Sequence, residues 1–217
     1  MKVSVVQGIL NANDQLALQN RRLLDEHGIC AINIMASPGS GKTSLILRTI
    51  EALQGKLRLG VIEGDIASRV DADKVAAAGV PVVQINTGGT CHLDAPMIRQ
   101  ALAGLPLDDI DLLVVENVGN LICPTGFRLG EHAQVMVASV PEGDDKPYKY
   151  PAMFTQVDAI VVNKTDLLPY LDFDQAAFRQ VVMGLNADVR FFEVSCKTGQ
   201  GVEEWAEWLL NLTKWAK

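Results

Sequence analysis

Short apolar runs alternate with amphipathic stretches along the chain. Four of the runs are continuous rather than interrupted by polar residues, which is typical of strands covered on both faces. Strands are predicted at residues 30–36, 57–63, 80–86, 112–116, 134–140, 159–163 and 189–194. Helices are predicted at residues 14–26, 42–53, 72–78, 95–103, 174–183 and 202–215. This alternation predicts an α/β fold with a mostly parallel sheet, helices on both faces and functional residues at the carboxyl ends of the strands.

Composition narrows the class of protein. The 217 residues include 19 Lys and Arg against 26 Asp and Glu, which gives a net charge of −7, and 48% are hydrophobic. These values exclude a disordered chain, and the negative charge argues against nonspecific binding to nucleic acid or to an anionic membrane. Neither a targeting signal nor an apolar run long enough to span a bilayer is visible. We therefore expect a cytoplasmic protein.

A glycine-rich segment follows the first predicted strand and leads directly into a helix. It reads Ala36-Ser37-Pro38-Gly39-Ser40-Gly41-Lys42-Thr43 and fits the phosphate-binding pattern GxxxxGK[ST], except that Ala36 replaces the first glycine. The glycines let backbone N–H groups surround phosphate oxygens, the lysine neutralises the β- and γ-phosphates, and the threonine hydroxyl ligates Mg²⁺. The residues expected to bind phosphate are Gly39, Ser40, Gly41, Lys42, Thr43 and Ser44.

Two predicted strands end in carboxylates beside this loop. Glu63-Gly64-Asp65 closes one of them and Glu116 closes the other. A carboxylate at such a place holds Mg²⁺ directly or through water. We assign Glu116 to Mg²⁺, and Asp65 either to Mg²⁺ or to positioning the attacking water, with Lys42 as the third catalytic residue. The alternative is a solvated acid at each strand end, and neither carboxylate is expected in the buried core.

The segment Asn163-Lys164-Thr165-Asp166 has the NKxD form that is typical of GTP-binding proteins. Asp166 can accept two hydrogen bonds from guanine, whereas adenine has no such pair of donors. Lys164 can cover the face of the ring, and Asn163 can tie this loop to the phosphate loop. A later segment, Ser195-Cys196-Lys197-Thr198-Gly199, stands where a backbone reads the guanine carbonyl. Together these segments predict a P-loop protein that binds GTP or GDP.

Two further segments at predicted strand ends carry soft metal ligands, Cys91-His92 and Cys123. Each cysteine alone could be a small buried residue, but thiolate and imidazole prefer nickel, zinc or copper(I) to magnesium. One chain offers three ligands, whereas a two-fold dimer would bring four thiolates and two imidazoles to its axis. We hypothesise a nickel or zinc site that two subunits share. His132 is a weaker candidate ligand.

The four cysteines are dispersed, which indicates free thiols in a reducing compartment. Cys30 begins a predicted strand and is expected in the core, and Cys196 is expected near the guanine rather than at a metal. Residues 16, 17, 23 and 24 give the first helix an apolar face that either packs on the sheet or, with residues 1–9, docks a small partner. Lys146 either contacts the nucleotide across a dimer or is a solvated loop lysine.

These motifs together resemble the hydrogenase maturation GTPases that insert nickel, the HypB family, from about residue 10 to the C-terminus. The matching stretches are residues 37–43, 63–65, 86–88, 91–95, 116–124, 142–147, 149–151 and 163–170. The Cys91-His92 pair combined with the later Cys123-Pro124 is the most specific part of this resemblance. It implies a single P-loop GTPase domain of the SIMIBI type at residues 30–217, preceded by an N-terminal segment and helix at residues 1–29.

The resemblance also implies an activity and partners. Such proteins hydrolyse GTP slowly, dimerise with nucleotide and hold Ni²⁺ or Zn²⁺ through the residues that match Cys91, His92 and Cys123. They deliver nickel to the large subunit of NiFe hydrogenase together with a HypA-type zinc-containing nickel chaperone. The absence of an evident arginine finger also predicts slow turnover.

Three other readings stay open at this point. A urease-accessory nickel GTPase shares the P-loop and NKxD but typically pairs its ligands as Cys-Pro-His, whereas Thr125 follows Cys123-Pro124 here. A non-catalytic metal-binding scaffold would retain nucleotide without hydrolysing it. A small-molecule P-loop kinase would leave the NKxD segment without an explanation.

Overall fold

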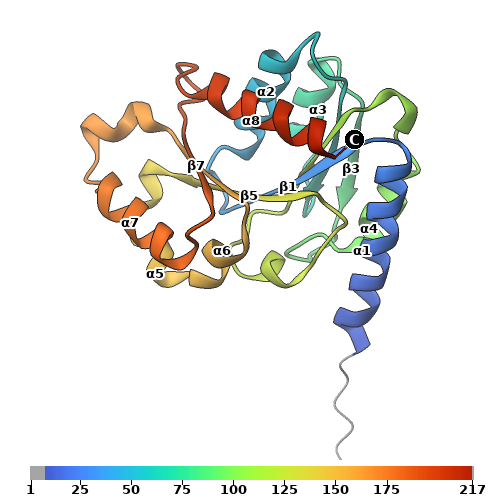
Figure 1. The fold of residues 1–217 in the computed structure, drawn as a ribbon, viewed down its shortest axis with the longest axis horizontal. Coiled ribbons are helices and arrows are strands. Elements are labelled where there is room, and N and C mark those ends of the chain that lie inside the picture. The colour runs from blue at the N-terminus through green and yellow to red at the C-terminus, as the bar shows by residue number, and fades with distance from the viewer. Residues whose placement is uncertain (1–7, 217) are drawn as a thin grey trace, which may run out of the picture.

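The computed structural model describes residues 8–216. Within them, seven strands form one sheet in the order β3-β2-β4-β1-β5-β6-β7, and every neighbouring pair is parallel. The strands are β1 (Cys30–Ala36), β2 (Leu59–Asp65), β3 (Val82–Asn86), β4 (Leu112–Glu116), β5 (Ala133–Ser139), β6 (Ala159–Asn163) and β7 (Arg190–Glu193). The expected α/β fold with a mainly parallel sheet is confirmed, and β1, between β4 and β5, lies at its centre (Figure 1).

Helices cover both faces of the sheet, as expected (Figure 1). They are α1 (Gly8–Glu26), α2 (Lys42–Leu53), α3 (Val70–Ala77), α4 (Ala95–Leu102), α5 (Lys146–Lys149), α6 (Pro151–Gln156), α7 (Gln175–Leu185) and α8 (Val202–Trp215). Residues of α2, α3 and α8 share one apolar core with the sheet, whereas α1 and α4, and α6 and α7, pack on its other face in two further cores. Burial on both faces explains the continuous apolar runs of the central strands.

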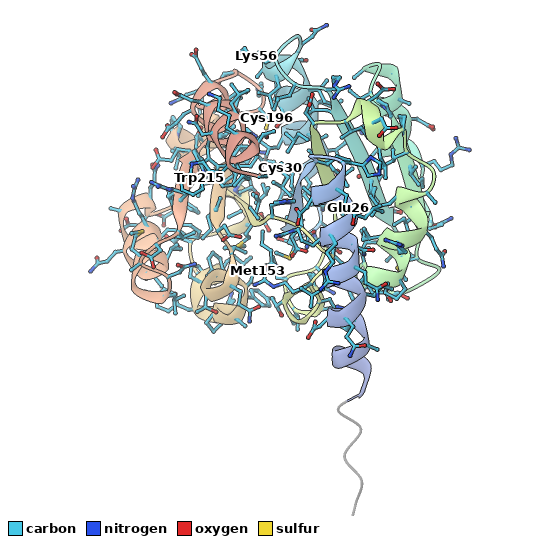
Figure 2. All side chains as sticks on the ribbon, turned by 45° about the vertical axis from the view of Figure 1, so that its right-hand side comes forward. Glu26, Cys30, Lys56, Met153, Cys196 and Trp215 are labelled. Atoms are coloured by element: carbon cyan, nitrogen blue, oxygen red, sulfur yellow. The ribbon has the colours of Figure 1, made fainter. Side chains whose placement is uncertain are left out.

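The buried core holds Cys30, which is fully enclosed (Figure 2). Burial raises the pKa of its thiol to about 11, so that Cys30 behaves as a small apolar side chain. All four cysteines are free thiols, in agreement with the sequence-based expectation. Cys30 is therefore a core residue and is not part of a functional site.

Helix α1 packs against the rest of the domain through a face that carries both apolar and polar side chains. Ala17 and Leu24 are buried, in agreement with the packing alternative, while Leu18 is 61% exposed. Asn20 donates hydrogen bonds to the backbone oxygens of Ala95 and Leu129. The docking alternative also involved residues 1–9, of which residues 1–7 lie outside the described residues. Within residues 8–216, helix length and apolar character nowhere combine to the degree needed to cross a membrane.

Element boundaries differ from the prediction where local sequence is ambiguous. Strand β2 begins and ends two residues later than expected, so that Glu63 lies inside it. The short helices α5 and α6 were not predicted, and neither was the 3₁₀ segment Thr165–Tyr170 that follows β6. The start of helix α4, in contrast, was predicted correctly. There the Asp94 side chain caps the helix by accepting a hydrogen bond from the Met97 N–H, and Pro96 lies in the first turn.

Candidate functional site

The phosphate loop turns between β1 and α2 through two glycines in left-handed conformation. Gly39 has φ 79° and Gly41 has φ 100°. A Cβ at Gly41 would also collide with the Asn163 side-chain nitrogen, which donates a hydrogen bond of 3.0 Å to the Ser40 backbone oxygen. Glycine is thus required at position 41 both by the backbone and by this close approach. The loop is clamped directly to the NKxD segment.

Lys42 and Thr43, which open helix α2, meet the end of strand β4. Lys42 Nζ lies 3.8 Å from Glu116 Oε1, and Thr43 Oγ1 donates to the same oxygen at 3.2 Å. The second oxygen, Glu116 Oε2, is buried without a hydrogen-bond partner. A buried carboxylate with a free oxygen beside a threonine hydroxyl fits the hard-oxygen chemistry of Mg²⁺. These two residues would hold the ion.

Glu116 differs from the sequence-based expectation in its burial. It is 5% exposed, although neither strand-end carboxylate was expected in the buried core. The parallel register of β2 and β4 sets Glu63, which is 2% exposed, directly beside it. Burial and the neighbouring Glu116 raise the pKa of Glu63 to about 10. Glu63 therefore keeps its proton at neutral pH and can share it with Glu116.

Asp65 faces its own loop. Its Oδ1 accepts hydrogen bonds from the backbone N–H groups of Ala67, at 2.9 Å, and Ser68, at 2.6 Å. These bonds lower the pKa of Asp65, so that it stays ionised. The structure brings Lys42, Thr43 and Glu116 together and places Asp65 at the beginning of the loop that leads into α3.

Glu63→Gln should flatten the pH dependence of stability. The unfolded chain loses the Glu63 proton near the ordinary value of 4.5, whereas the folded chain keeps it to about pH 10. Unfolding then releases a proton between these values, so the free energy of unfolding falls as pH rises, by up to about 1.4 kcal/mol per pH unit. Urea unfolding without nucleotide at about pH 6, 7 and 8 measures this slope.

A second variant, at another buried glutamate, is the control for the Glu63→Gln experiment. Glu131 is 6% exposed and accepts hydrogen bonds from the Leu129 and Gly130 N–H groups, away from this carboxyl pair. Glu131→Gln controls for removing a buried carboxylate in general. Equal slopes in the wild type and in Glu63→Gln would show that Glu63 is ionised in the folded protein.

A pocket of about 430 Å³ lies between the phosphate loop and the two predicted base-binding segments. Its lining consists of Gly41, Ser44, Asn163, Lys164, Asp166, Leu167, Cys196 and Lys197. Lys164 Nζ donates a 2.7 Å hydrogen bond to the Gly39 backbone oxygen, which stretches its aliphatic stem along the pocket wall. The structure thus brings seven of the residues chosen from the sequence for nucleotide binding around one cavity.

Three polar contacts fix the geometry of this pocket. Ser195 Oγ donates a 2.6 Å hydrogen bond to Asp166 Oδ1, which orients the carboxylate. Asn163 Oδ1 accepts from the Cys196 N–H at 3.2 Å. Arg48 Nε, from helix α2, donates to the Cys196 backbone oxygen at 2.6 Å, a contact that sequence reasoning missed. Burial raises the pKa of the Cys196 thiol, which is labelled in Figure 2, to about 11, so this thiol is protonated at neutral pH.

The soft ligands converge at the same edge of the sheet. One ligand atom each from Cys91, His92 and Cys123 lies within 4.8 Å of the others, and Cys91 Sγ is 3.7 Å from His92 Nδ1. Ligand atoms that close together suit a single ion with bonds of about 2.0–2.3 Å. Burial lowers the pKa of His92, which favours the neutral imidazole that binds metals. The neighbouring Cys91 thiol raises the pKa of Cys123.

Two residues that the sequence did not single out support these ligands. The Phe127 ring packs against the His92 ring with centroids 4.0 Å apart and the ring planes tilted by 34°. Asn120 Nδ2 donates to Cys123 Sγ at 3.3 Å, and its Oδ1 accepts from the Cys123 N–H. Such contacts orient metal ligands and shield them from water. No sequence pattern pointed to Phe127, whereas Asn120 belongs to the stretch that carries the family resemblance.

His132 is not one of the clustered soft ligands, and the contact of Lys146 with a nucleotide across a dimer stays a prediction. His132 Nδ1 accepts from the Ala31 N–H at 3.0 Å and Nε2 lies 3.0 Å from Asp25 Oδ1, so both ring nitrogens of this weaker candidate ligand are engaged in other contacts. Lys146 Nζ donates to the Glu142 backbone oxygen at 2.6 Å.

Glu142 itself contacts the phosphate loop. Its side chain accepts hydrogen bonds from Ser37 of that loop and from Ser139, which makes it a further missed residue beside the proposed nucleotide site.

Comparison with known proteins identifies the family. The model of the CobW/HypB/UreG nucleotide-binding domain matches residues 30–193. The hydrogenase maturation factor HypB of Azotobacter vinelandii is 49% identical over 207 residues, which cover 94% of this chain and 68% of that protein. The probable HypB of Methanocaldococcus jannaschii is 40% identical and covers 99% of this chain and 97% of its own length. This chain belongs to the HypB family.

Solved HypB structures have the same fold. The HypB of Archaeoglobus fulgidus is 42% identical with a TM-score of 0.88, over 94% of this chain and 99% of that one. The HypB of Helicobacter pylori, solved in complex with nickel, is 36% identical with a TM-score of 0.89, over 94% and 95% of the two chains. A LAO/AO transport system kinase, 15% identical with a TM-score of 0.60 over 99% and 78%, shares the fold alone. The family and the SIMIBI-type fold expected from the sequence are thereby confirmed.

Proposed function

We propose that this HypB-family protein is a GTP-hydrolysing metallochaperone that carries nickel for the maturation of NiFe hydrogenase. The main support for this proposal is that the ligand atoms of Cys91, His92 and Cys123 lie within 4.8 Å of one another. Their loops follow strands at the same edge of the sheet as the carboxylates proposed to serve the nucleotide. Cys123 follows Glu116 by seven residues, so one loop reaches from one site to the other. The nickel complex of the Helicobacter pylori relative supports this assignment.

Nickel is the cargo in this proposal, and the donor set suits it. Two thiols and a neutral imidazole are borderline-to-soft ligands, which bind nickel and zinc well and magnesium poorly. A metal must displace the thiol protons of Cys91 and Cys123, so binding strengthens as pH rises. Zinc would fit the same three ligands.

GTP is the proposed nucleotide because of the carboxylate in the base pocket. Asp166 is oriented by Ser195, and a free carboxylate oxygen can accept from the two adjacent donors of guanine. Buried polar groups that find no partner disfavour adenine. The residues that would contact the base and ribose side are Asn163, Lys164, Asp166, Ser195, Cys196 and Lys197.

Slow hydrolysis follows from the groups at the phosphate end. Lys42 would neutralise the β- and γ-phosphates, and Thr43 and Glu116 would hold Mg²⁺, which supplies charge neutralisation on the phosphate oxygens when bound. Asp65, ionised and near the γ-phosphate position, would orient the attacking water. Arg48 is engaged with the Cys196 backbone and is not directed at phosphate. Without an arginine on the transferring group, turnover stays below the range of about 1–100 s⁻¹ typical of kinases.

Dimer formation would complete the metal site. One chain supplies three ligands, whereas a structural site is usually four-coordinate. Exposed apolar side chains lie on segments that follow neighbouring strands: Ile122, next to Cys123, is 66% exposed, Ile66, after β2, is 50% exposed, and Val70, at the start of α3, is 59% exposed. A second copy would cover them and bring its own Cys91, His92 and Cys123 to the two-fold axis. Closure of the loops after Glu63 and Glu116 onto GTP would favour this dimer, and hydrolysis would loosen it and release nickel.

The partners follow from the family. The proposed ones are a HypA-type zinc-containing nickel chaperone and the large subunit of NiFe hydrogenase, in the cytoplasm and without nucleic acid or membrane. One relative, from Helicobacter hepaticus and 39% identical, is a hydrogenase/urease maturation factor. That name favours urease as a second candidate target for the same nickel cargo.

Nickel titration in two nucleotide states tests this function. The reduced protein should bind nickel about 5- to 150-fold more tightly with a non-hydrolysable GTP analogue than with GDP, and sedimentation of the same samples should show more dimer. Lys42→Ala, which removes the phosphate contact, should lose this difference together with single-turnover GTP hydrolysis. Equal nickel affinity and equal dimer in both states would contradict the proposal, and absent hydrolysis in the wild type would favour a nucleotide-retaining scaffold.

A further inference from the structure

The Asn117 side chain lies buried between the nucleotide carboxylates and the loop that carries Cys91 and His92. It is 1% exposed and directly follows Glu116. Its Oδ1 accepts hydrogen bonds of 3.0 Å from the Leu93 N–H and from its own neighbour, Val118. Its Nδ2 donates at 3.2 Å to Asn33 Oδ1 in the central strand β1. One carboxamide therefore joins the end of β4, the metal-ligand loop and the middle of the sheet.

Leu93, the residue after His92, is held from a second side by strand β2. It is fully buried, and a Cβ on Gly64 would lie 2.7 Å from Leu93 Cδ1, so the leucine rests directly on the Gly64 backbone. Gly64 stands between Glu63 and Asp65. The backbone that carries His92 is thus fixed at both strand ends that present carboxylates to the nucleotide.

The Cys123 side of the metal site is attached differently. Asn120 holds Cys123 within its own turn, and Gly119 packs on Pro38 of the phosphate loop, where a Cβ would lie 3.0 Å from the Pro38 backbone nitrogen. The segment that carries Cys123 is therefore connected to the phosphate loop by direct packing. The Cys91-His92 pair has a different connection, which passes through Leu93.

We propose that Asn117 is the positioning residue that transmits the state of the nucleotide site to Cys91 and His92. This inference rests on the proposed function, because it assumes that nucleotide and nickel binding are coupled. When Glu116 moves toward Lys42 or a bound cation, the adjoining peptide and Asn117 move with it. Leu93 follows, since breaking its buried hydrogen bond to Asn117 would leave the Leu93 N–H without a partner. The ligand pair is thereby shifted relative to Cys123.

Asn117→Ala should abolish the coupling while leaving both sites in place. The ratio of nickel dissociation constants with GDP and with the GTP analogue should fall from the wild-type value to within about two-fold of unity. Affinity for the analogue in the absence of nickel should stay within about three-fold, because Asn117 lines neither the base pocket nor the phosphate loop. By linkage, nickel should also cease to change the affinity for the analogue, which gives a readout independent of nickel titration.

Asn13 offers a matched control on the same loop. It is also buried, and its Oδ1 accepts a 2.9 Å hydrogen bond from the Ala95 N–H, two residues beyond Leu93, but it belongs to α1 and is remote from the nucleotide. Asn13→Ala should keep the wild-type ratio even where it lowers the melting temperature. A general loosening of the loop would instead reduce the ratio in both variants, and that result would overturn the assignment to Asn117.

Asn117→Asp supplies a second variant with the acceptor retained. The unpaired Asn33 Nδ2 can donate to the introduced carboxylate after an amide flip, so the Leu93 contact survives. This variant should keep the coupling, and its loss there would overturn the inference even if Asn117→Ala fails to fold. A wild-type ratio of one would overturn the proposed function and the inference together. A wild-type ratio above one that Asn117→Ala preserves would overturn the inference alone.

Discussion

Cys91→Ala and Cys123→Ala should each lower nickel affinity by more than about 100-fold while GTP binding stays within about two-fold of wild type. Loss of a contact that merely orients a metal ligand typically costs 10- to 100-fold, and loss of the ligand itself removes a metal–sulfur bond as well. Neither thiol lines the base pocket. Nickel titration of the reduced variants with the GTP analogue, beside nucleotide titration, measures both effects.

Cys196→Ala is the matched control for removing a thiol. Cys196 lies in the base pocket, and its protonated thiol is not near the three ligands. This variant should bind nickel like the wild type, with any effect confined to nucleotide. The assignment of the metal site would be wrong if Cys196→Ala weakened nickel binding as much as Cys91→Ala does, or if Cys123→Ala left nickel binding intact.

The parts of the proposed nucleotide site could be recognised in the sequence because they are local. Lys42 and Thr43 sit in one turn whose glycines can be recognised from residue type alone, and the NKxD segment directly follows a strongly apolar strand. The rule that ligands bind at the carboxyl ends of parallel strands then places these segments at one edge without any knowledge of strand order. The short helix Lys146–Lys149 could not be found in this way, since four residues are too few to show helical periodicity.

What the sequence could not supply is the register between strands. Glu63 and Glu116 are 53 residues apart, and their pairing depends on β2 lying beside β4 with those two residues opposite each other. Strand β2 ends two residues later than expected, so that Glu63 lies inside the strand and not at its end. There it is buried and protonated. The burial of Glu116 has the same origin, because Lys42 and Glu63 close over it from different elements.

The proposed metal site needed both donor chemistry and a loop path that only the structure gives. Cys91 follows β3 at the edge of the sheet, and Cys123 follows β4, with β2 between these strands. The two cysteines meet because the loop after β3 crosses the end of β2, where Gly64 leaves room for Leu93. Residue types suggested that the ligands belong together, whereas the supporting contacts of Phe127 and Asn117 depend on this crossing.

Asp166→Asn should weaken GTP binding by at least about 100-fold and transfer the preference to xanthosine triphosphate. The carboxylate can accept hydrogen bonds from both donors of guanine, and hydrogen bonds to a charged group are worth about 1.5–3 kcal/mol each. In the variant, the Ser195 hydroxyl, which now donates to Asp166 Oδ1, should keep the amide oxygen on its own side. The amide NH₂ then faces the base, where it opposes the guanine amine and pairs with the xanthine carbonyl.

Titration with guanine and xanthine nucleotides measures this exchange, and Asp172→Asn, at an exposed position of the same loop, is the control that should retain GTP. The variant also separates nucleotide from nickel. Its three metal ligands are untouched, so nickel affinity should respond to a xanthosine triphosphate analogue and no longer to the GTP analogue. Retained guanine preference would show that Asp166 does not read the base. A nickel response to neither nucleotide, with xanthosine triphosphate bound, would show that base recognition is itself part of the coupling between the two sites.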